Sequence, residues 1–498
     1  MPSNVFISRC PDDILLEIFS ATVHSPQSHM NRAAEFNPLT LARFASQVCN
    51  RWRRLVLSSS PLWGKLLDLN DLDQKSNHWR DEVLARTGQA RLHVQVILDP
   101  QLPQVTSFFF RIMDEEWPRI QDFHVYNRQG GCLDDNRWLT LQRPTETLRS
   151  FRLWLPDQNL KYLHSSNSIL FSDHAPSLHY LEIHPMAFRL PAKGFSQLRI
   201  LRLVGPFLPR QFLLSFCQTF PVLEYLTVGF EESETLHDLW PNVQFPRLQD
   251  LKLHGRLATC LRVLEHITAP EHCGLSLSTL DQHFVQPASS ISEALSPFLK
   301  NHTPSRILLR VSSVMFTFRL DSPKPPHFDL NILCREPFLK STCFEAVLGC
   351  PFSQVTRLKF KARSPSNLAS SDSNFRQFIA SFSSVTELVA TPKTLQLLVQ
   401  VGNLTNGIIL PALKDLRLSL LDPEMPQKIV IFLDWRKAAG VPLESLDLRA
   451  PLGRKDLDFS ELERFTGMVV KWGMDRMFEL YTCGSGNAQR LNFSKPPQ

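Results

Sequence analysis

One short phrase of apolar and polar positions, apolar-x-x-apolar-x-apolar, recurs along most of this chain. Alternation of this kind is typical of a strand with one buried face, so each copy predicts a short strand. Successive copies start 20 to 30 residues apart, except across a gap of 107 residues, where degenerate copies are expected at residues 272–277 and 306–311. The copies span residues 120–125, 148–153, 178–183, 198–203, 223–228, 248–253, 355–360, 385–390, 413–418 and 443–448.

The segments between the phrases predict return connections, several of them helical. Residues 424–439 give one complete example, an amphipathic helix that ends at Gly440 and is followed by Pro442 and the next strand. A strand and a return repeated with this period indicate a leucine-rich-repeat solenoid. We therefore predict an α/β fold in which such a solenoid occupies residues 119–483. Prolines, which cannot continue a helix into the strand, lie two residues before four phrases, at Pro176, Pro221, Pro246 and Pro411.

The N-terminal segment shows helical periodicity instead. Residues 11–19 predict a helix whose first turn carries Asp12 and Asp13, which suit the positive end of the helix dipole. A second helix is expected over residues 39–48, after a polar loop at residues 24–37. A helical module of this size buries too little surface to be stable alone, so its apolar residues predict a further contact surface.

Three blocks of this segment resemble the F-box motif, namely residues 11–19, 48–55 and 62–63. With the repeats that follow, the chain is similar to the large fungal families of F-box proteins with leucine-rich repeats. It departs from the usual motif at Cys10, where these families have leucine, and in the long loop between the first two helices. The resemblance covers residues 5–69 and implies an F-box that docks the Skp adaptor of an SCF-type cullin-RING ubiquitin ligase. It also implies that the repeats bind the protein substrate.

The resemblance assigns adaptor contacts to apolar residues in all three blocks and in the second helix. For any single residue, the alternative is packing inside a small three-helix unit. The implied adaptor-binding residues are Pro11, Ile14, Leu15, Ile18, Phe19, Leu41, Phe44, Val48, Trp52, Leu55 and Trp63.

The alternate positions of the repeated strands predict the substrate surface, because in a leucine-rich repeat they face the ligand and not the core. Aromatic residues at these positions predict an anchor patch, with lateral packing as the alternative. Period-2 spacing also places a basic run on one strand face, where an acidic or phosphorylated segment would find donors. Salt bridges to Glu387 and Asp415 are the alternative for this run. The candidates are Trp154, Tyr180 and Tyr225 for the patch, Arg357, Lys359, Lys361 and Arg363 for the run, and Arg152 and Arg417 at equivalent strand positions.

Composition and charge narrow the function classes. The chain has 498 residues, a net charge of +6 and a hydrophobic share of 43%, which is ordinary for a globular protein and too weakly basic to indicate a nucleic-acid-binding protein. Ten cysteines without a C-x-x-C pair predict buried, reduced thiols in a cytoplasmic or nuclear protein. The sequence shows neither a signal-peptide core nor a membrane-spanning stretch. Motifs for nucleotide binding, hydrolysis and zinc are missing, so we expect no enzyme activity, no metal and no cofactor.

These patterns predict an F-box at residues 5–69, a linker or solenoid cap at 70–118, the solenoid at 119–483 and a flexible tail at 484–498. Two other functions stay open. The first is a scaffold that docks the adaptor without ubiquitin transfer. The second is a repeat protein that binds nucleic acid through Arg51–Arg54 and Arg357–Arg363, which a steep loss of affinity with salt would support.

Overall fold

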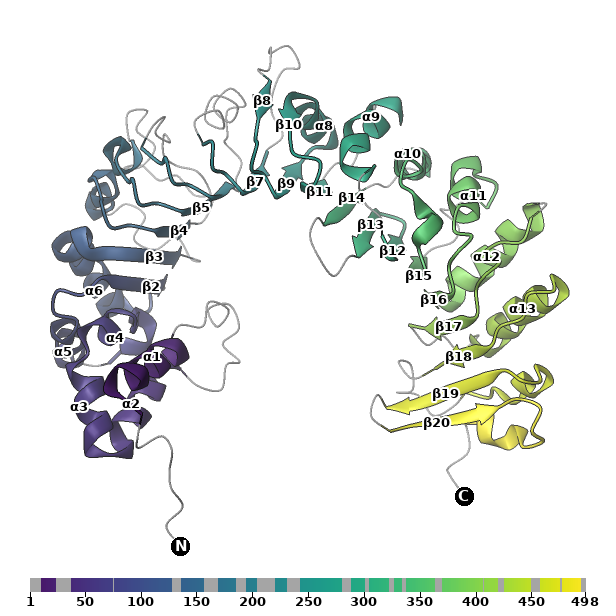
Figure 1. Ribbon diagram of the computed structural model, residues 1–498, viewed down its shortest axis with the longest axis horizontal. Coiled ribbons are helices and arrows are strands. Elements are labelled where there is room, and N and C mark those ends of the chain that lie inside the picture. Colours follow the sequence, from purple (N-terminus) through teal and green to yellow (C-terminus); the bar gives the residue numbers. More distant parts are fainter. Residues whose placement is uncertain are drawn as a thin grey trace, which may run out of the picture. The chain divides into compact units, whose positions relative to one another are not determined.

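The structure is a computed structural model, and it describes residues 10–23, 37–74, 76–127, 136–155, 169–184, 194–203, 220–230, 242–279, 288–300, 304–321, 327–333, 337–362, 370–405, 407–419, 425–448, 457–474 and 477–493. These residues form two compact units, the first ending at Phe230 and the second beginning at Asn242. Each unit combines a sheet with helices (Figure 1). The repeat pattern alone does not predict this division.

Short helices form the N-terminal part of the first unit. The side chain of Asn37 caps α2 by accepting a hydrogen bond from the backbone N–H of Leu39 at 2.7 Å, and Pro38 occupies the first helical turn. Cys49 is extended, so it ends α2 and caps α3. The helices are α1 (Asp12–Val23), α2 (Pro38–Val48), α3 (Asn50–Ser58), α4 (Ser60–Gly64) and α5 (His78–Arg86). The two helices expected from the sequence are thereby confirmed.

A parallel sheet follows these helices, and its strands pair in chain order. The strands expected from the repeated phrase are confirmed, and their apolar positions lie in register, as Leu181 does with Leu201 and Leu201 with Leu226. These leucines are buried, whereas the alternate positions are half-buried or exposed. The strands are β1 (Leu67–Asp68), β2 (Leu92–Leu98), β3 (Ile120–Asn127), β4 (Ser150–Trp154), β5 (Tyr180–His184), β6 (Ile200–Leu203) and β7 (Tyr225–Gly229).

Aromatic rings fill the core beside this sheet. The rings of Phe123 and Phe151 stack at a centroid distance of 5.1 Å, and Phe171 meets Phe151 edge-on at 5.2 Å. Phe195 extends the row at 5.9 Å from Phe171. Strands and returns both contribute rings, so the row joins successive repeats through stacked and edge contacts. The returns include α6 (Pro103–Glu116) and the 3-10 helices η3 (Trp117–Arg119), η4 (Asn136–Gln142) and η5 (Leu170–Asp173).

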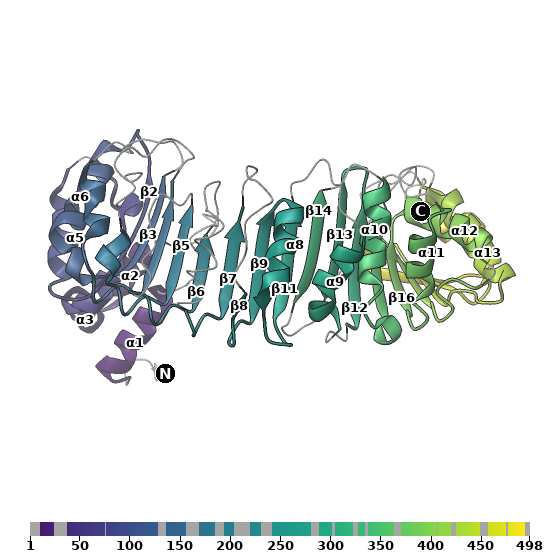
Figure 2. The same ribbon diagram turned by 90° about the horizontal axis from the view of Figure 1, so that it is seen from above.

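The second unit has a longer sheet with helices along one of its faces (Figures 1 and 2). Its strands pair in the order β9–β11–β14–β13–β12–β15–β16–β17–β18–β19–β20, and only β13 and β20 run antiparallel to the strands beside them. A separate pair joins β8 (Val243–Gln244) to β10 (Ile267–Thr268). The sheet strands are β9 (Asp250–Gly255), β11 (Gly274–Thr279), β12 (Arg306–Val311), β13 (Met315–Asp321), β14 (Phe328–Leu333), β15 (Arg357–Ala362), β16 (Glu387–Ala390), β17 (Asp415–Leu418), β18 (Ser445–Asp447), β19 (Val469–Met474) and β20 (Met477–Thr482). The helices are α8 (Leu257–His266), α9 (Ala288–Leu299), α10 (Pro337–Val347), α11 (Ser373–Ala380), α12 (Pro392–Leu404) and α13 (Met425–Ala438).

An inserted hairpin explains the long gap in the repeat pattern. After β11 the chain forms β12, and then β13 and β14 fill the places between these two strands. The degenerate copies expected at residues 272–277 and 306–311 correspond to β11 and β12 and are confirmed as strands. They are not neighbours, because β11 pairs with β14 while β12 pairs with β13 and β15.

Two of the predicted segments need comment. Residues 70–118 fit the predicted cap and not the linker, because β2 is a full member of the sheet between β1 and β3. Residues 484–493 are not a flexible tail, because a 3-10 helix, η9 (Ala488–Leu491), buries Leu491 completely, and the ring of Phe493 lies 5.6 Å from that of Trp472. In both places, a few apolar side chains cover an end of a core that would otherwise face water.

Candidate functional site

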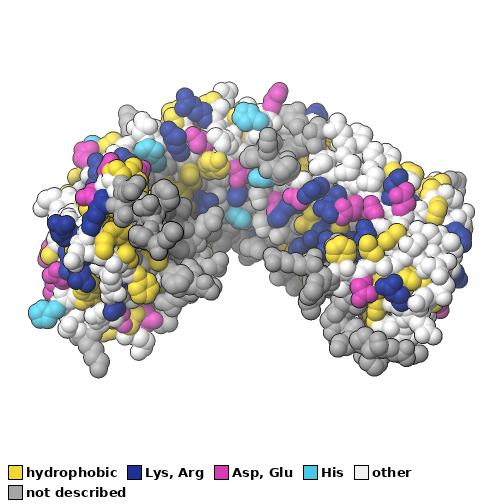
Figure 3. Space-filling view, turned by 60° about the horizontal axis from the view of Figure 1, so that its bottom comes forward, with side chains coloured by type: hydrophobic (Ala, Val, Ile, Leu, Met, Phe, Trp, Pro, Cys, Tyr) yellow, Lys and Arg dark blue, Asp and Glu magenta, His cyan; other side chains and the backbone are white. Residues whose placement is uncertain are grey.

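Large apolar side chains are exposed on the N-terminal helices. Ile14 and Ile18 on α1 are 40% and 42% exposed, and Phe44 and Val48 on α2 are 51% and 63% exposed. Spacings of four residues place each pair on one side of its helix. Figure 3 shows hydrophobic side chains at the surface of the unit that holds these helices. We call Ile14, Ile18, Phe44 and Val48 the apolar surface.

Other residues of the predicted adaptor set lie inside the helical module. Leu15, Phe19 and Trp63 are buried, so in the free chain they show the internal packing that the sequence left open as the alternative to adaptor contact. The ring of Phe19 packs edge-on against Trp52 at 4.9 Å, and the indole N–H of Trp63 donates to the Val56 carbonyl at 2.8 Å. The motif needs these large side chains to hold the helices together. Of the remaining predicted residues, Pro11 is exposed, and Leu41, Trp52 and Leu55 are half-buried.

The arginine cluster next to the apolar surface takes part in the fold. The Arg51 guanidinium bonds the Asp12 carboxylate at 2.5 and 2.8 Å and the Cys10 carbonyl at 2.5 Å, which ties α3 to the start of α1. Arg53 donates to the Ser46 carbonyl at 3.2 Å. Two of the cations proposed for nucleic acid therefore have partners within the module.

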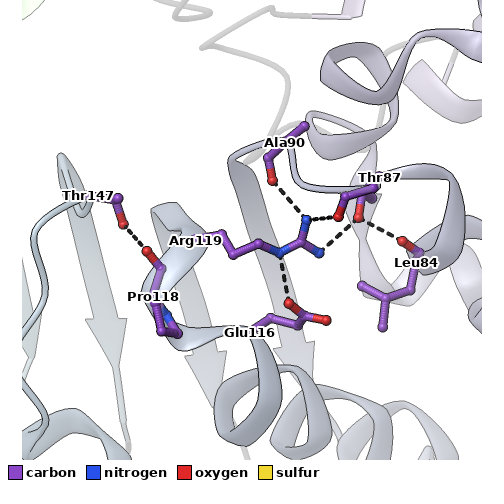
Figure 4. A network of polar contacts seen from close by, with 8 residues as sticks. Leu84, Thr87, Ala90, Glu116, Pro118, Arg119 and Thr147 are labelled. Atoms are coloured by element: carbon purple, nitrogen blue, oxygen red, sulfur yellow. Dashed lines mark hydrogen bonds and ion pairs between the residues drawn. The ribbon is translucent and has the colours of Figure 1, made fainter.

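Polar contacts join the helical module to the sheet of the same unit. Arg119 of η3 donates to the Ala90 carbonyl and to the Thr87 hydroxyl, each at 3.0 Å, and bonds Glu116 at 2.7 Å (Figure 4). Gly64 also lies against this region, because a Cβ atom there would come within 2.3 Å of the Arg91 carbonyl oxygen. The apolar surface is thereby held on a rigid base.

The comparison with protein families identifies this module. Residues 7–68 match the F-box-like family model. No curated protein matches the chain. The chain therefore carries an F-box-like domain, and domains of this class generally bind Skp-type adaptors. The matched region ends within β1, so the domain and the sheet share one element.

The predicted aromatic patch takes a different form in the first unit. Trp154 stacks on His184 at 4.6 Å and lies 6.2 Å from Tyr126, so its ring partners are on β3 and β5. Tyr180 instead lies under the Arg152 guanidinium at 4.4 Å. Glu182 joins Trp154 and Tyr180, because it accepts a hydrogen bond from each of these side chains.

The electrostatics around Tyr180 follow from this arrangement. Burial and the Glu182 carboxylate raise the pKa of the Tyr180 hydroxyl above its ordinary value, so the phenol stays protonated as a donor. Arg152 and Arg202 each lie 3.8 Å from the same carboxylate. Tyr225 on β7 is 37% exposed and, in the strand register, is aligned with Tyr180 through Ile200 of β6.

The predicted basic run lies on β15 in the second unit. Arg357 forms an ion pair with Glu387, as the alternative interpretation expected, while Lys359 and Lys361 are half-buried on the face away from the helices. Arg417 lies 3.8 Å from Asp447. Arg363 lies outside the described residues. The sequence pattern missed Arg306 and Arg310 on β12, which are far from β15 in sequence but pair with it.

Within the described part of the chain, no group of His, Cys, Asp or Glu is arranged to hold a metal ion. No helix there is both long enough and apolar enough to cross a membrane. Burial raises the pKa of the Cys273 and Cys350 thiols to about 12 each, so both are protonated and weakly nucleophilic. Cys49 is exposed and Cys10 is half-buried, which corrects the expectation of uniformly buried thiols.

Proposed function

We propose that this protein is the substrate-recognition subunit of an SCF-type cullin-RING ubiquitin ligase. The observation that carries the proposal is the apolar surface, because a domain matching the F-box-like family exposes four large apolar side chains on two helices. Surfaces of this kind mark protein interaction sites. In this proposal, the Skp adaptor covers the apolar surface, and Leu41, Trp52 and Leu55 extend the contact at its edge.

The remainder of the chain then serves as a leucine-rich-repeat-type solenoid for target binding. Three features support this assignment: strands at a period of 20 to 30 residues, parallel pairing, and apolar positions in register. The strand face opposite the helices carries the polar and aromatic side chains that a target would contact. In this proposal the chain does no bond chemistry itself, and the free thiols among its described cysteines suit the cytoplasm or nucleus.

The mechanism in this proposal is proximity. Binding the adaptor and the target on one chain converts ubiquitin transfer from a bimolecular encounter into an effectively intramolecular one. Such a mechanism requires the adaptor site to be held firmly. The Arg119 contacts and the close approach at Gly64 meet this requirement by fixing the F-box-like domain to its sheet.

A pull-down of the full chain with purified Skp adaptor tests the proposal. The double variant Ile18→Asp and Val48→Asp places charges in the apolar surface, and we expect it to lose adaptor binding while keeping its circular dichroism spectrum. Leu139→Asp is the matched control, since Leu139 is 44% exposed in the same unit but lies on η4. Failure of the folded parent to bind, or binding by the double variant, would refute adaptor docking.

A second assay distinguishes a substrate receptor from a scaffold. Point variants are preferable to a deletion here, because removing the F-box-like domain would also remove β1 from the sheet. A receptor predicts that bound target proteins accumulate in cells that carry the double variant in place of the parent. Unchanged target levels, together with intact adaptor binding by the parent, would favour the scaffold.

A further inference from the structure

A pocket lies beside the second helix of the F-box-like domain. Its volume is about 470 Å³, which falls within the range of about 300–1,000 Å³ that is usual for ligand sites. Residues of α2, α3, α4 and α5 line it, together with residues of the 3-10 helix η2 (Leu69–Leu72) and of the turn that follows. All of these elements belong to the first unit. The pocket is therefore formed by the F-box-like domain and the segment directly after it.

Aromatic and aliphatic side chains provide the apolar part of this pocket. The rings of Trp63 and Trp79 meet edge-on at 6.4 Å. The indole N–H of Trp63 donates to the Val56 carbonyl, so the polar atom of this ring is already satisfied inside the module. Leu57 also lines the pocket and is 39% exposed. Together, these side chains offer a partner an apolar site for one large side chain.

Two arginines line the pocket, and they differ in their surroundings. Arg86 on α5 donates to the Glu82 carboxylate at 2.8 Å, and its guanidinium lies 4.8 Å from the Trp63 ring. Arg43 on α2 is exposed and forms no ion pair among the described residues. Asp71 is the acidic residue of the lining, and it has an interaction of its own. Arg43 is therefore the charge that is available to a partner, and a carboxylate is its natural complement.

The pocket and the apolar surface lie on different sides of α2. Residues three or four positions apart share one side of a helix. Leu39, Arg43 and Ser46 form the side that lines the pocket, whereas Phe44 and Val48 form the other side. A ligand in the pocket therefore does not compete directly with an adaptor on the apolar surface.

We propose that this pocket binds an acidic segment of a partner protein. The segment inserts one aromatic side chain against Trp63, Trp79 and Leu57, and it places a carboxylate at Arg43. A nucleic acid would need several cations in a row, and the other cation of the lining, Arg86, is already paired with Glu82. The inference goes beyond the proposed function, because it gives the F-box-like domain a second partner site.

Selection of peptides from a phage-displayed library of random heptapeptides on the full chain tests the inference. Ser46→Trp places a large ring in the pocket and gives a blocked form of the chain. Gln47→Trp is the matched control, because it adds the same ring at the next, exposed position of α2, outside the lining. We expect to select peptides that bind the parent and Gln47→Trp but not Ser46→Trp. These peptides should carry an aromatic residue close to an aspartate or glutamate.

Fluorescence polarisation with the strongest selected peptide then measures the two parts of the contact. Arg43→Gln should weaken binding by about fivefold, as expected for an ion pair at an exposed position. Arg54→Gln is the matched control, because Arg54 is exposed on α3 outside the lining, and it should leave the affinity unchanged. Converting the acidic residue of the peptide to its amide should weaken binding to the parent, with no further loss in Arg43→Gln. Replacing the aromatic residue of the peptide by alanine should weaken binding by about tenfold or more.

Three results would overturn the inference. The first is that no selected peptide distinguishes Ser46→Trp from Gln47→Trp. The second is equal binding of the acidic peptide and its amide form by the parent. The third is a fall in the melting temperature of Ser46→Trp and Arg43→Gln that accounts for their lost binding. The double variant Ile18→Asp and Val48→Asp should lose the adaptor and keep the peptide, so this inference and the proposed function can fail separately.

Discussion

Replacing Trp63 tests whether this side chain stabilises the F-box-like domain or contacts the adaptor directly. Trp63 is one of the residues assigned to the adaptor by resemblance, yet it is buried. Its indole N–H bonds the Val56 carbonyl at 2.8 Å, its ring meets Trp79 edge-on at 6.4 Å, and the Arg86 guanidinium lies 4.8 Å from it. Trp63→Ala should therefore act on the stability of the domain, and on adaptor binding only through that stability.

The expected magnitude follows from these contacts. Truncating a buried tryptophan to alanine costs about 3–5 kcal/mol, and the unpaired Val56 carbonyl adds about 1 kcal/mol. Trp63→Phe keeps most of the packing and should cost about 1–2 kcal/mol through the lost donor. Since a whole domain is stable by only about 5–15 kcal/mol, Trp63→Ala would leave the helical module substantially unfolded.

Hydrogen exchange measured by mass spectrometry on the full chain checks this locally. Peptides from α3 and α4 should lose protection in Trp63→Ala, while peptides from α12 in the second unit serve as an internal reference. Val48→Asp is the comparison variant, because Val48 is 63% exposed and should lose adaptor binding with normal protection. Loss of adaptor binding by Trp63→Ala with full protection of α3 and α4 would refute the reasoning and return Trp63 to the contact surface.

Two further substitutions test contacts inside each unit, one in the second unit and one in the first. Arg436→Met removes a buried guanidinium that donates to four backbone carbonyls. In urea denaturation it should lower the free energy of unfolding of the second unit by about 3 kcal/mol or more. The control is Lys437→Met at an exposed position, and an unchanged denaturation midpoint for Arg436→Met would contradict the prediction. Gly64→Ala forces a Cβ against the Arg91 carbonyl and should cost about 1–3 kcal/mol, whereas Gly349→Ala, with open space around it, should not lower the midpoint.

Periodicity predicts a feature only where it repeats along the chain. The strands β3 to β7 and β15 to β18 follow the phrase, because burial of one strand face requires apolar residues at alternate positions. The same reasoning located β11 and β12 but not β13 and β14, which lie between them in the sheet. β13 runs antiparallel to both of its neighbours, and burial at the three consecutive positions Phe316 to Phe318 does not follow the apolar and polar alternation of its sequence.

Resemblance to the F-box motif identified the correct module but not the role of each residue in it. Leu15 and Ile18 are both apolar residues of one helix, and only their angular positions decide that the first is buried and the second is exposed. Arg436 shows a further limit, because its four carbonyl acceptors come from backbone segments that folding brings together. Residue type and spacing alone therefore predict neither which of the two helix residues is buried nor the carbonyl acceptors of Arg436.

The inserted hairpin is the place where the repeat pattern fails and where like charges meet on neighbouring strands. In the observed register Asp329 of β14 aligns with Lys359 of β15, through Arg319 and Leu308 on the two strands between them. The hairpin puts β13 and β12 between β14 and β15, and β12 supplies Arg306 and Arg310. The irregular insertion thus places Arg306 beside Arg357 and Arg310 beside Lys361. Because like charges on neighbouring strands destabilise a sheet, Arg310→Glu should keep or raise the melting temperature of the second unit, and a clear fall in that temperature would contradict this reasoning.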